Sequence, residues 1–123
     1  MKKFKALPKS VRIAGFDIPV SEVSRQTMKR KTGGYYLGFW FANREILILK
    51  EIPLQMRWQT LWHECLHEIE WIVTNEAKMS DCNIDEEDRH SLFTKLTWAL
   101  LVDNDWLNIY VDRKKKQNGQ KKL

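Results

Sequence analysis

Two histidines and a glutamate in the middle of the chain have the spacing of a zinc site. Residues 63–67 have the sequence His-Glu-Cys-Leu-His, an HExxH motif, within a segment of helical periodicity. On an α-helix, side chains four residues apart lie on one face, about one turn apart. His63 and His67 can therefore bind one Zn²⁺, and Glu64 beside them can act as general base toward water. The pattern indicates metal-assisted hydrolysis.

The motif departs from its usual form at two positions. Cys65 stands where a bulky aliphatic residue is common, and Glu68 follows the second histidine where an apolar residue is common. Neither position ligates the metal in this motif. Cys65 lies about 200° around the helix from His63, so we expect it to be a small core residue and not a ligand.

A catalytic zinc site also needs a third protein ligand and an open position for water. The extended motif with Gly at 70 and His at 73 is excluded, because these positions hold Glu70 and Val73. The acidic segment 85–88, about 20 residues after His67, offers a carboxylate at the start of a second expected helix. His90 is an alternative that would give a three-histidine site. We expect Glu70 to be exposed, or to orient a metal ligand without binding the metal itself.

Length and charge predict one domain with a tail. The 123 residues, 43% of them hydrophobic and 11% aromatic, are enough for one modest core. The net charge of +5 comes from residues 113–123, which hold six of the 21 basic residues and no acid. We expect a domain over residues 1–112 and a disordered basic tail over residues 113–123. Such a tail can bind nucleic acid electrostatically, although solvation is its commoner role.

No segment has the pattern of a membrane span or a signal peptide. The most apolar run, residues 45–49, is far too short to cross a bilayer, and the basic residues 1–5 lead into no apolar stretch. The two cysteines, Cys65 and Cys82, form no CxxC pair, which argues against a zinc ribbon or a disulfide scaffold. These features favour a reducing cytoplasm.

The first predicted strand has a break in its alternation. Residues 11–13 and 16–20 alternate in opposite phase, so we expect a bulge or turn at the Ala14-Gly15 dipeptide between them. Pro19 predicts that this strand lies at a sheet edge, because proline donates no ladder hydrogen bond.

A polar segment and a hairpin come next. Residues 21–34 predict either a short helix capped by Ser21 or a loop closed by its two final glycines. Residues 35–41 and 45–49 predict two strands joined by a short turn. Apolar residues at consecutive positions of the second strand predict burial on both of its faces.

Two helices and a final apolar segment complete the expected domain. Pro53 suits the first turn of a helix whose apolar residues recur at helical spacing as far as Ile72, with the two histidines at the edge of that stripe. Asn83 or Asp85 can cap the second helix. Residues 106–111 predict a strand or one more helical turn. We assign most of the six tryptophans to the core or to cleft walls.

Residues 60–67, Thr-Leu-Trp-His-Glu-Cys-Leu-His, resemble the T-L-x-H-E-x-x-H segment of the ImmA/IrrE-like metallopeptidases. The chain is most similar to the small members found in phages and prophages, which also have an acidic pair at the start of the last helix, here Glu86-Glu87. The resemblance covers about residues 11–107. With the order of hairpin, HExxH helix and second helix, it implies an α+β fold, a minimal zincin-like domain in which a small sheet packs on both helices.

The resemblance also implies the third zinc ligand. In this family the ligand is a Glu six residues before a Phe, and Glu87 stands six residues before Phe93. The small residue expected between them is His90 here, and Glu86, seven residues before Phe93, shares its helix face. The implied ligands are thus His63, His67 and Glu87, with Glu86 as the alternative.

These features predict a zinc-dependent metallopeptidase that hydrolyses a protein or peptide in a phage or bacterial setting, with Glu64 as general base. We expect the substrate to add as a strand to the hairpin that precedes the HExxH helix. The candidate oxyanion donors are Tyr35, Tyr36, Tyr110 and His90. Two alternatives are a catalytically silent zinc-binding regulatory or interaction module, and a protease held on nucleic acid by its basic tail.

Overall fold

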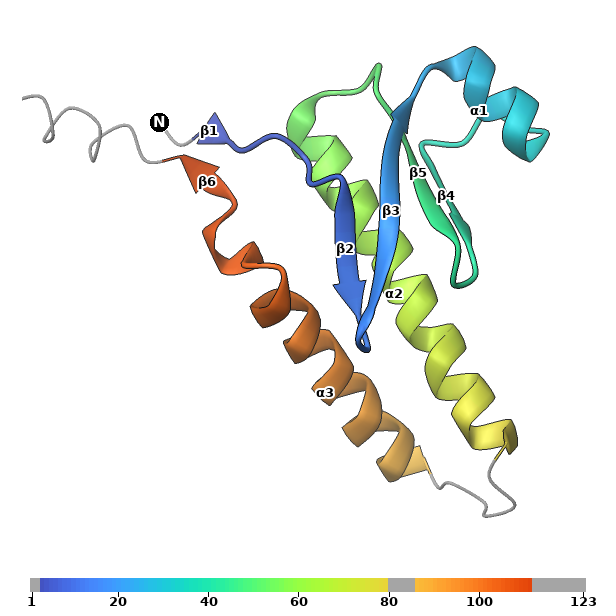
Figure 1. Ribbon diagram of the computed structural model, residues 1–123, viewed down its shortest axis with the longest axis vertical. Helices are drawn as coiled ribbons and strands as arrows, with labels where there is room; N and C mark the ends of the chain where they lie inside the picture. Colours follow the sequence, from blue (N-terminus) through green and yellow to red (C-terminus); the bar gives the residue numbers. More distant parts are fainter. Residues whose placement is uncertain (1–2, 80–85, 112–123) are drawn as a thin grey trace, which may run out of the picture.

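The computed structural model describes residues 3–79 and 86–111, without the side chains of residues 76–79, 86, 87, 107 and 111. The elements in chain order are β1 (Lys3–Phe4), β2 (Ser10–Ile13), β3 (Phe16–Val23), α1 (Arg25–Thr32), β4 (Gly38–Phe41), β5 (Glu45–Leu49), α2 (Leu54–Met79), α3 (Glu86–Asp103), a 3₁₀ turn (Trp106–Asn108) and β6 (Tyr110–Val111). The fold is α+β, as predicted. Figure 1 shows α2 and α3 packed side by side next to the sheet.

The main sheet has four strands in the order β2-β3-β5-β4. The hairpin pairs β2–β3 and β4–β5 are antiparallel, and β3 and β5 pair in parallel at the centre. The predicted hairpin is confirmed, although β4 begins at Gly38 instead of residue 35. The order leaves β4 at one edge of this sheet, beside α2.

The turn expected between the first two strand segments is present. Ala14 and Gly15 both have positive φ, 51° and 85°, which is the two-residue hairpin turn that matches strand twist. The edge position expected from Pro19 is wrong, because β3 lies between β2 and β5. Proline is tolerated there because the pairing with β5 begins only at Val20, so Pro19 removes no hydrogen bond from that ladder.

The polar segment forms a helix, but its cap is not Ser21. The Ser24 side chain accepts a hydrogen bond from the Thr27 backbone N–H, and Ser21 belongs to β3. Gly33, with φ of 85°, ends α1 in the left-handed conformation that favours glycine. Helix α1 packs on β5 and buries Met28 completely.

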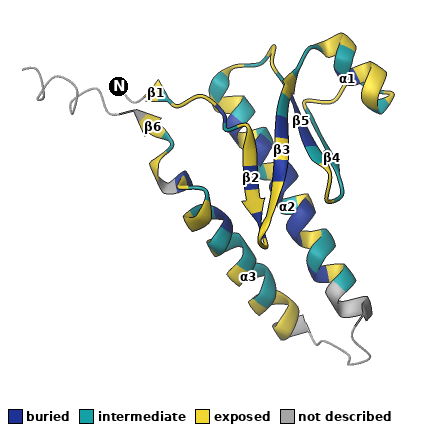
Figure 2. Cartoon of the chain, viewed as in Figure 1, coloured by how far each residue is buried: buried dark blue, intermediate teal, exposed yellow. Residues whose placement is uncertain are grey.

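The core lies between the sheet and the two long helices. Ile46, Leu47 and Ile48 of β5 are fully buried, which confirms the prediction of burial on both faces. Ile46 and Ile48 belong to one apolar cluster with Leu61, Cys65 and Ile69 of α2 and Leu100 of α3. Figure 2 shows the buried stripe of α2 beside the sheet. Trp98, 61% exposed, is one tryptophan that lies outside this core.

The carboxyl end of α3 is fixed to the sheet by Asn104. Its Oδ1 accepts from the Arg12 N–H (2.7 Å), and its Nδ2 donates to the carbonyls of Arg12 (2.9 Å) and Leu100 (2.8 Å). The 3₁₀ turn and β6 follow, so residues 106–111 contain both predicted alternatives. Strand β6 pairs with β1, which brings the two ends of the described chain together (Figure 1).

Several sequence predictions fall outside the described residues: the caps Asn83 and Asp85, the second cysteine Cys82, and the basic tail 113–123. Over residues 3–79 and 86–111, no helix combines the length and apolar character needed to cross a bilayer.

Gly38 allows β4 to approach α2 closely. A Cβ at this position would overlap Thr60 Cγ2 and would lie 3.2 Å from Glu64 Cγ. Thr60 cannot easily turn away, because its hydroxyl donates to the Met56 carbonyl at 2.7 Å. The edge strand and the HExxH helix therefore meet at a position without a side chain.

We expect Gly38→Ala to lower the free energy of unfolding by about 1–3 kcal/mol through overpacking. Chemical denaturation of the metal-free protein measures this change. Thr60→Ser removes the overlapping methyl group but keeps the hydroxyl, so the double variant should recover part of the loss. Gly34→Ala is the matched control, since its nearest neighbour is the exposed ring of Tyr36, which can move. Equal losses in the two glycine variants would contradict the close approach.

Candidate metal centre

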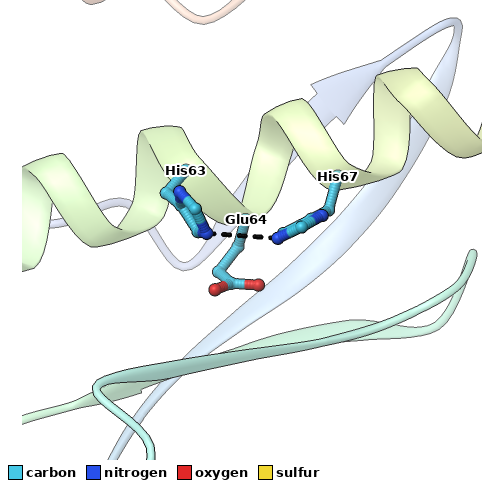
Figure 3. Close-up of side chains that lie close together, drawn as sticks. All are labelled: His63, Glu64 and His67. Atoms are coloured by element: carbon cyan, nitrogen blue, oxygen red, sulfur yellow. Dashed lines mark hydrogen bonds between the residues drawn. The ribbon is translucent and has the colours of Figure 1, made fainter.

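The two motif histidines lie on one exposed face of α2 with their rings turned toward each other. Their Nε2 atoms are 3.1 Å apart, and the ring planes are nearly perpendicular at 86° (Figure 3). Two nitrogens that each lie about 2.0–2.1 Å from a tetrahedral zinc ion would be about 3.3 Å apart. The separation therefore suits a shared metal ion, as well as a hydrogen bond between the rings.

Glu64 lies beside the imidazoles, on the side that faces the hairpin (Figure 3). It is 7% exposed, and burial raises the pKa of its carboxyl group above the ordinary 4.5, against the opposing effect of His67 and His63. Ligand atoms of these three residues all lie within 4.8 Å of one another. The arrangement places a carboxylate with a raised pKa next to two exposed imidazoles, which is suitable for proton transfer at a metal site.

Glu68, which departs from the usual motif, has a structural role that the motif does not predict. Its side chain is fully buried. One carboxylate oxygen accepts from Trp40 Nε1 at 3.2 Å, and the other accepts from the Asn43 backbone N–H at 2.8 Å. The helical position could have revealed this burial, because residue 68 lies three and seven positions after the core residues Cys65 and Leu61.

A cavity of about 590 Å³ opens beside the imidazoles, between α2 and α3. His63, His67 and Glu70 of α2 line it, and so do Arg89 and His90 of α3. Glu70 is exposed, as predicted. Among the described side chains, neither Glu70 nor His90 joins the group of ligand atoms within 4.8 Å, which consists of the three motif residues.

The predicted third ligand, Glu87, stays a prediction. Glu86 and Glu87 are in the first turn of α3, and their side chains are not described. Helix α3 begins at Glu86, and His90 and Phe93, further along the same helix, line the cavity beside His63.

The tyrosines suggested as oxyanion donors lie in different places. Tyr36 lines a cleft of about 470 Å³ with Gly38, His63 and Glu64. Tyr35 is exposed and packs under Arg25 and Lys29 of α1.

Tyr110, the third of these tyrosines, packs against Phe4 with tilted rings where β1 and β6 pair. It lines a separate cleft with Trp58 and Trp106. Of the three tyrosines, only Tyr36 lines a cleft together with the motif.

The prediction that Cys65 is a core residue is confirmed. Its side chain is fully buried, and burial, together with the carboxylates of Glu64 and Glu68, raises the pKa of its thiol far above the ordinary range. A thiol that stays protonated is a poor ligand and a poor nucleophile.

Comparison of the chain with protein-family models, curated proteins and solved structures found no match. The family resemblance around the motif therefore rests on the residues of this chain alone.

We expect Glu64→Gln to stabilise the metal-free protein at pH 7. Because burial raises the pKa of Glu64, the folded state binds a proton more readily than the unfolded chain, and the contribution of this group to stability falls as pH rises from 4.5 through the folded-state pKa. The glutamine side chain stays neutral at every pH. The stability gained by the substitution should therefore be present at pH 7 and disappear below pH 4.5.

Thermal unfolding across this pH range measures the difference. Glu70→Gln controls for the loss of one negative charge from an exposed position of α2. An advantage of Glu64→Gln that grows as pH falls would contradict the assigned direction of the pKa shift.

We also expect the Cys65 thiol to be unreactive in the folded protein. In a Cys82→Ser background, Cys65 is the only thiol. Ellman's reagent should then detect about one thiol per chain in denaturant and almost none under native conditions, because the thiolate is the reactive form. Rapid reaction of the folded protein would place Cys65 at an accessible surface and overturn its assignment to the core.

Proposed function

We propose that the chain is a zinc-dependent metallopeptidase with a zincin-like domain, in which His63 and His67 bind the metal and Glu64 acts as general base. The observation that carries this proposal is the 3.1 Å separation of the two Nε2 atoms beside the buried Glu64 carboxylate. Two exposed imidazoles on one helix face are the donor set that zinc prefers. A zinc ion held there supplies a Lewis acid that lowers the pKa of water and polarises a carbonyl group.

The third ligand in this proposal comes from the first turn of α3. The resemblance favours Glu87, and helical spacing supports Glu86. Glu86 stands four and seven residues before His90 and Phe93, whose side chains line the cavity beside His63. His90, which lines the same cavity as His63 and His67, is the remaining alternative.

Glu64 carries the proton transfers in the proposed reaction. It takes a proton from the attacking water and later donates it to the leaving amine. A general base works best when its pKa is near the working pH, and burial moves the pKa of Glu64 in that direction. The two imidazoles beside it favour its charged form, so it stays available as a base.

Strand β4 is the proposed platform for the substrate. It is an edge strand of the main sheet, and a Cβ added to its first residue, Gly38, would lie 3.3 Å from Glu64 Oε1. A peptide that pairs with this edge would run past the base with its main chain held by backbone hydrogen bonds. The cleft lined by Tyr36, Met56 and Thr60 would receive one of its side chains.

Metal analysis tests the first half of the proposal. We expect about one zinc per purified wild-type chain, and loss of zinc in His63→Ala and His67→Ala while the chain stays folded. Selective loss in one of Glu86→Ala, Glu87→Ala or His90→Ala identifies the third ligand. Zinc content that His63→Ala leaves unchanged would refute the site.

Peptide hydrolysis tests the second half. A proteome-derived peptide library is incubated with zinc-loaded wild type and with zinc-loaded Glu64→Gln, and mass spectrometry detects new termini. We expect cleavage by the wild type and at least about a hundredfold loss in the variant, because the general base is removed. A fully zinc-loaded wild type that cleaves nothing would instead favour a zinc-binding module without catalysis.

A further inference from the structure

One metal-binding imidazole lies against an indole from the hairpin. The rings of Trp40, on β4, and His67, on α2, are nearly parallel at 16°, with centroids 5.9 Å apart. Trp40 is half-buried and packs against the apolar core. This contact joins two elements that are far apart in sequence at one of the two metal ligands.

His67 has little else to fix its orientation. Within the described part of the chain, its imidazole hydrogen-bonds only to that of His63. In most metal sites a hydrogen bond to the second ring nitrogen fixes the histidine. Apart from its contact with the His63 ring, the aromatic contact that the structure gives the His67 ring is the one with Trp40.

Glu68 in turn fixes Trp40. Its Oε2 accepts from the indole Nε1 and its Oε1 accepts from the Asn43 N–H, so both oxygens of a fully buried carboxylate bind the hairpin. Both donors are neutral. Burying a carboxylate in this way is unfavourable compared with burying an apolar side chain, and packing alone does not require it. What the carboxylate adds is direction, because its hydrogen bond fixes where the indole N–H points.

We propose that Glu68 and Trp40 are positioning residues for the metal ligand His67. Glu68 orients the indole, and the indole keeps the His67 ring in the conformation in which its Nε2 lies 3.1 Å from that of His63. The inference rests on the proposed zinc site, but it concerns how the ligand is pre-oriented, which can be measured with and without metal.

Zinc affinity, measured by competition with a chromophoric chelator, tests the proposal. We expect Trp40→Leu and Glu68→Leu each to weaken zinc binding by about tenfold or more, as for residues that orient a metal ligand. Trp40→Phe keeps an aromatic face but loses the hydrogen bond to Glu68, so its loss of affinity should be smaller than that of Trp40→Leu and similar to that of Glu68→Leu. This order distinguishes orientation of His67 from general packing.

Trp58 provides the matched control. Its indole N–H also donates a hydrogen bond, to the Lys5 carbonyl at 2.8 Å, and its ring packs edge-on against Trp106. Trp58→Leu should therefore lower the melting temperature of the metal-free protein at least as much as Trp40→Leu, yet leave zinc affinity within about twofold. Equal effects of both substitutions on zinc affinity would overturn the positioning role.

A second readout needs no metal. In proton NMR of the metal-free protein, the His67 ring protons should be shifted by the Trp40 ring current, and the shift should vanish in Trp40→Leu and shrink in Glu68→Leu. An unshifted His67 ring in the wild type would overturn the inference. A shifted ring in a wild type that binds no zinc would refute only the proposed function.

Discussion

The packing of the β4–β5 hairpin against α2 is the constraint on which the candidate site depends. Gly38 lets the edge strand approach the helix closely, and Glu68 ties the helix to the turn between β4 and β5. Between these two contacts lie Glu64 and both histidines. The helix alone places the histidines on one face, but the hairpin makes one wall of the site and buries the glutamate.

Glu64 and Glu68 show how differently two carboxylates one helical turn apart can be accommodated. Both are buried on the hairpin side of α2. Glu68 has each oxygen occupied by an N–H group from the hairpin, which makes it part of the framework. Glu64 has no such donors among the described residues, and its pKa is raised by burial. An unpaired carboxylate with a raised pKa is a costly feature in a stable fold and a useful one for proton transfer.

Local sequence was sufficient to predict much of this fold. Consecutive apolar residues in β5, the alternation across the Ala14-Gly15 turn and the helical spacing around the motif all predicted what the structure shows. The errors came from contacts between distant segments. Strand β3 runs on to Val23 because β5 pairs beside it, which made Pro19 internal and displaced the expected cap. The Glu68 and Trp40 contacts are likewise long-range, and no local pattern contains them.

The way in which α3 is held has a consequence for how the molecule would respond to metal. Asn104 and the β1–β6 pair fix the carboxyl end of this helix, whereas its amino end borders the cavity beside the imidazoles. An ion bound by α2 and by the first turn of α3 would act as a cross-link between residue 67 and that turn, closing a loop as a disulfide does. Removal of the ion by a chelator would then separate the two helices first at the end that borders the cavity. The backbone amides at the carboxyl end of α3 would stay protected from hydrogen exchange.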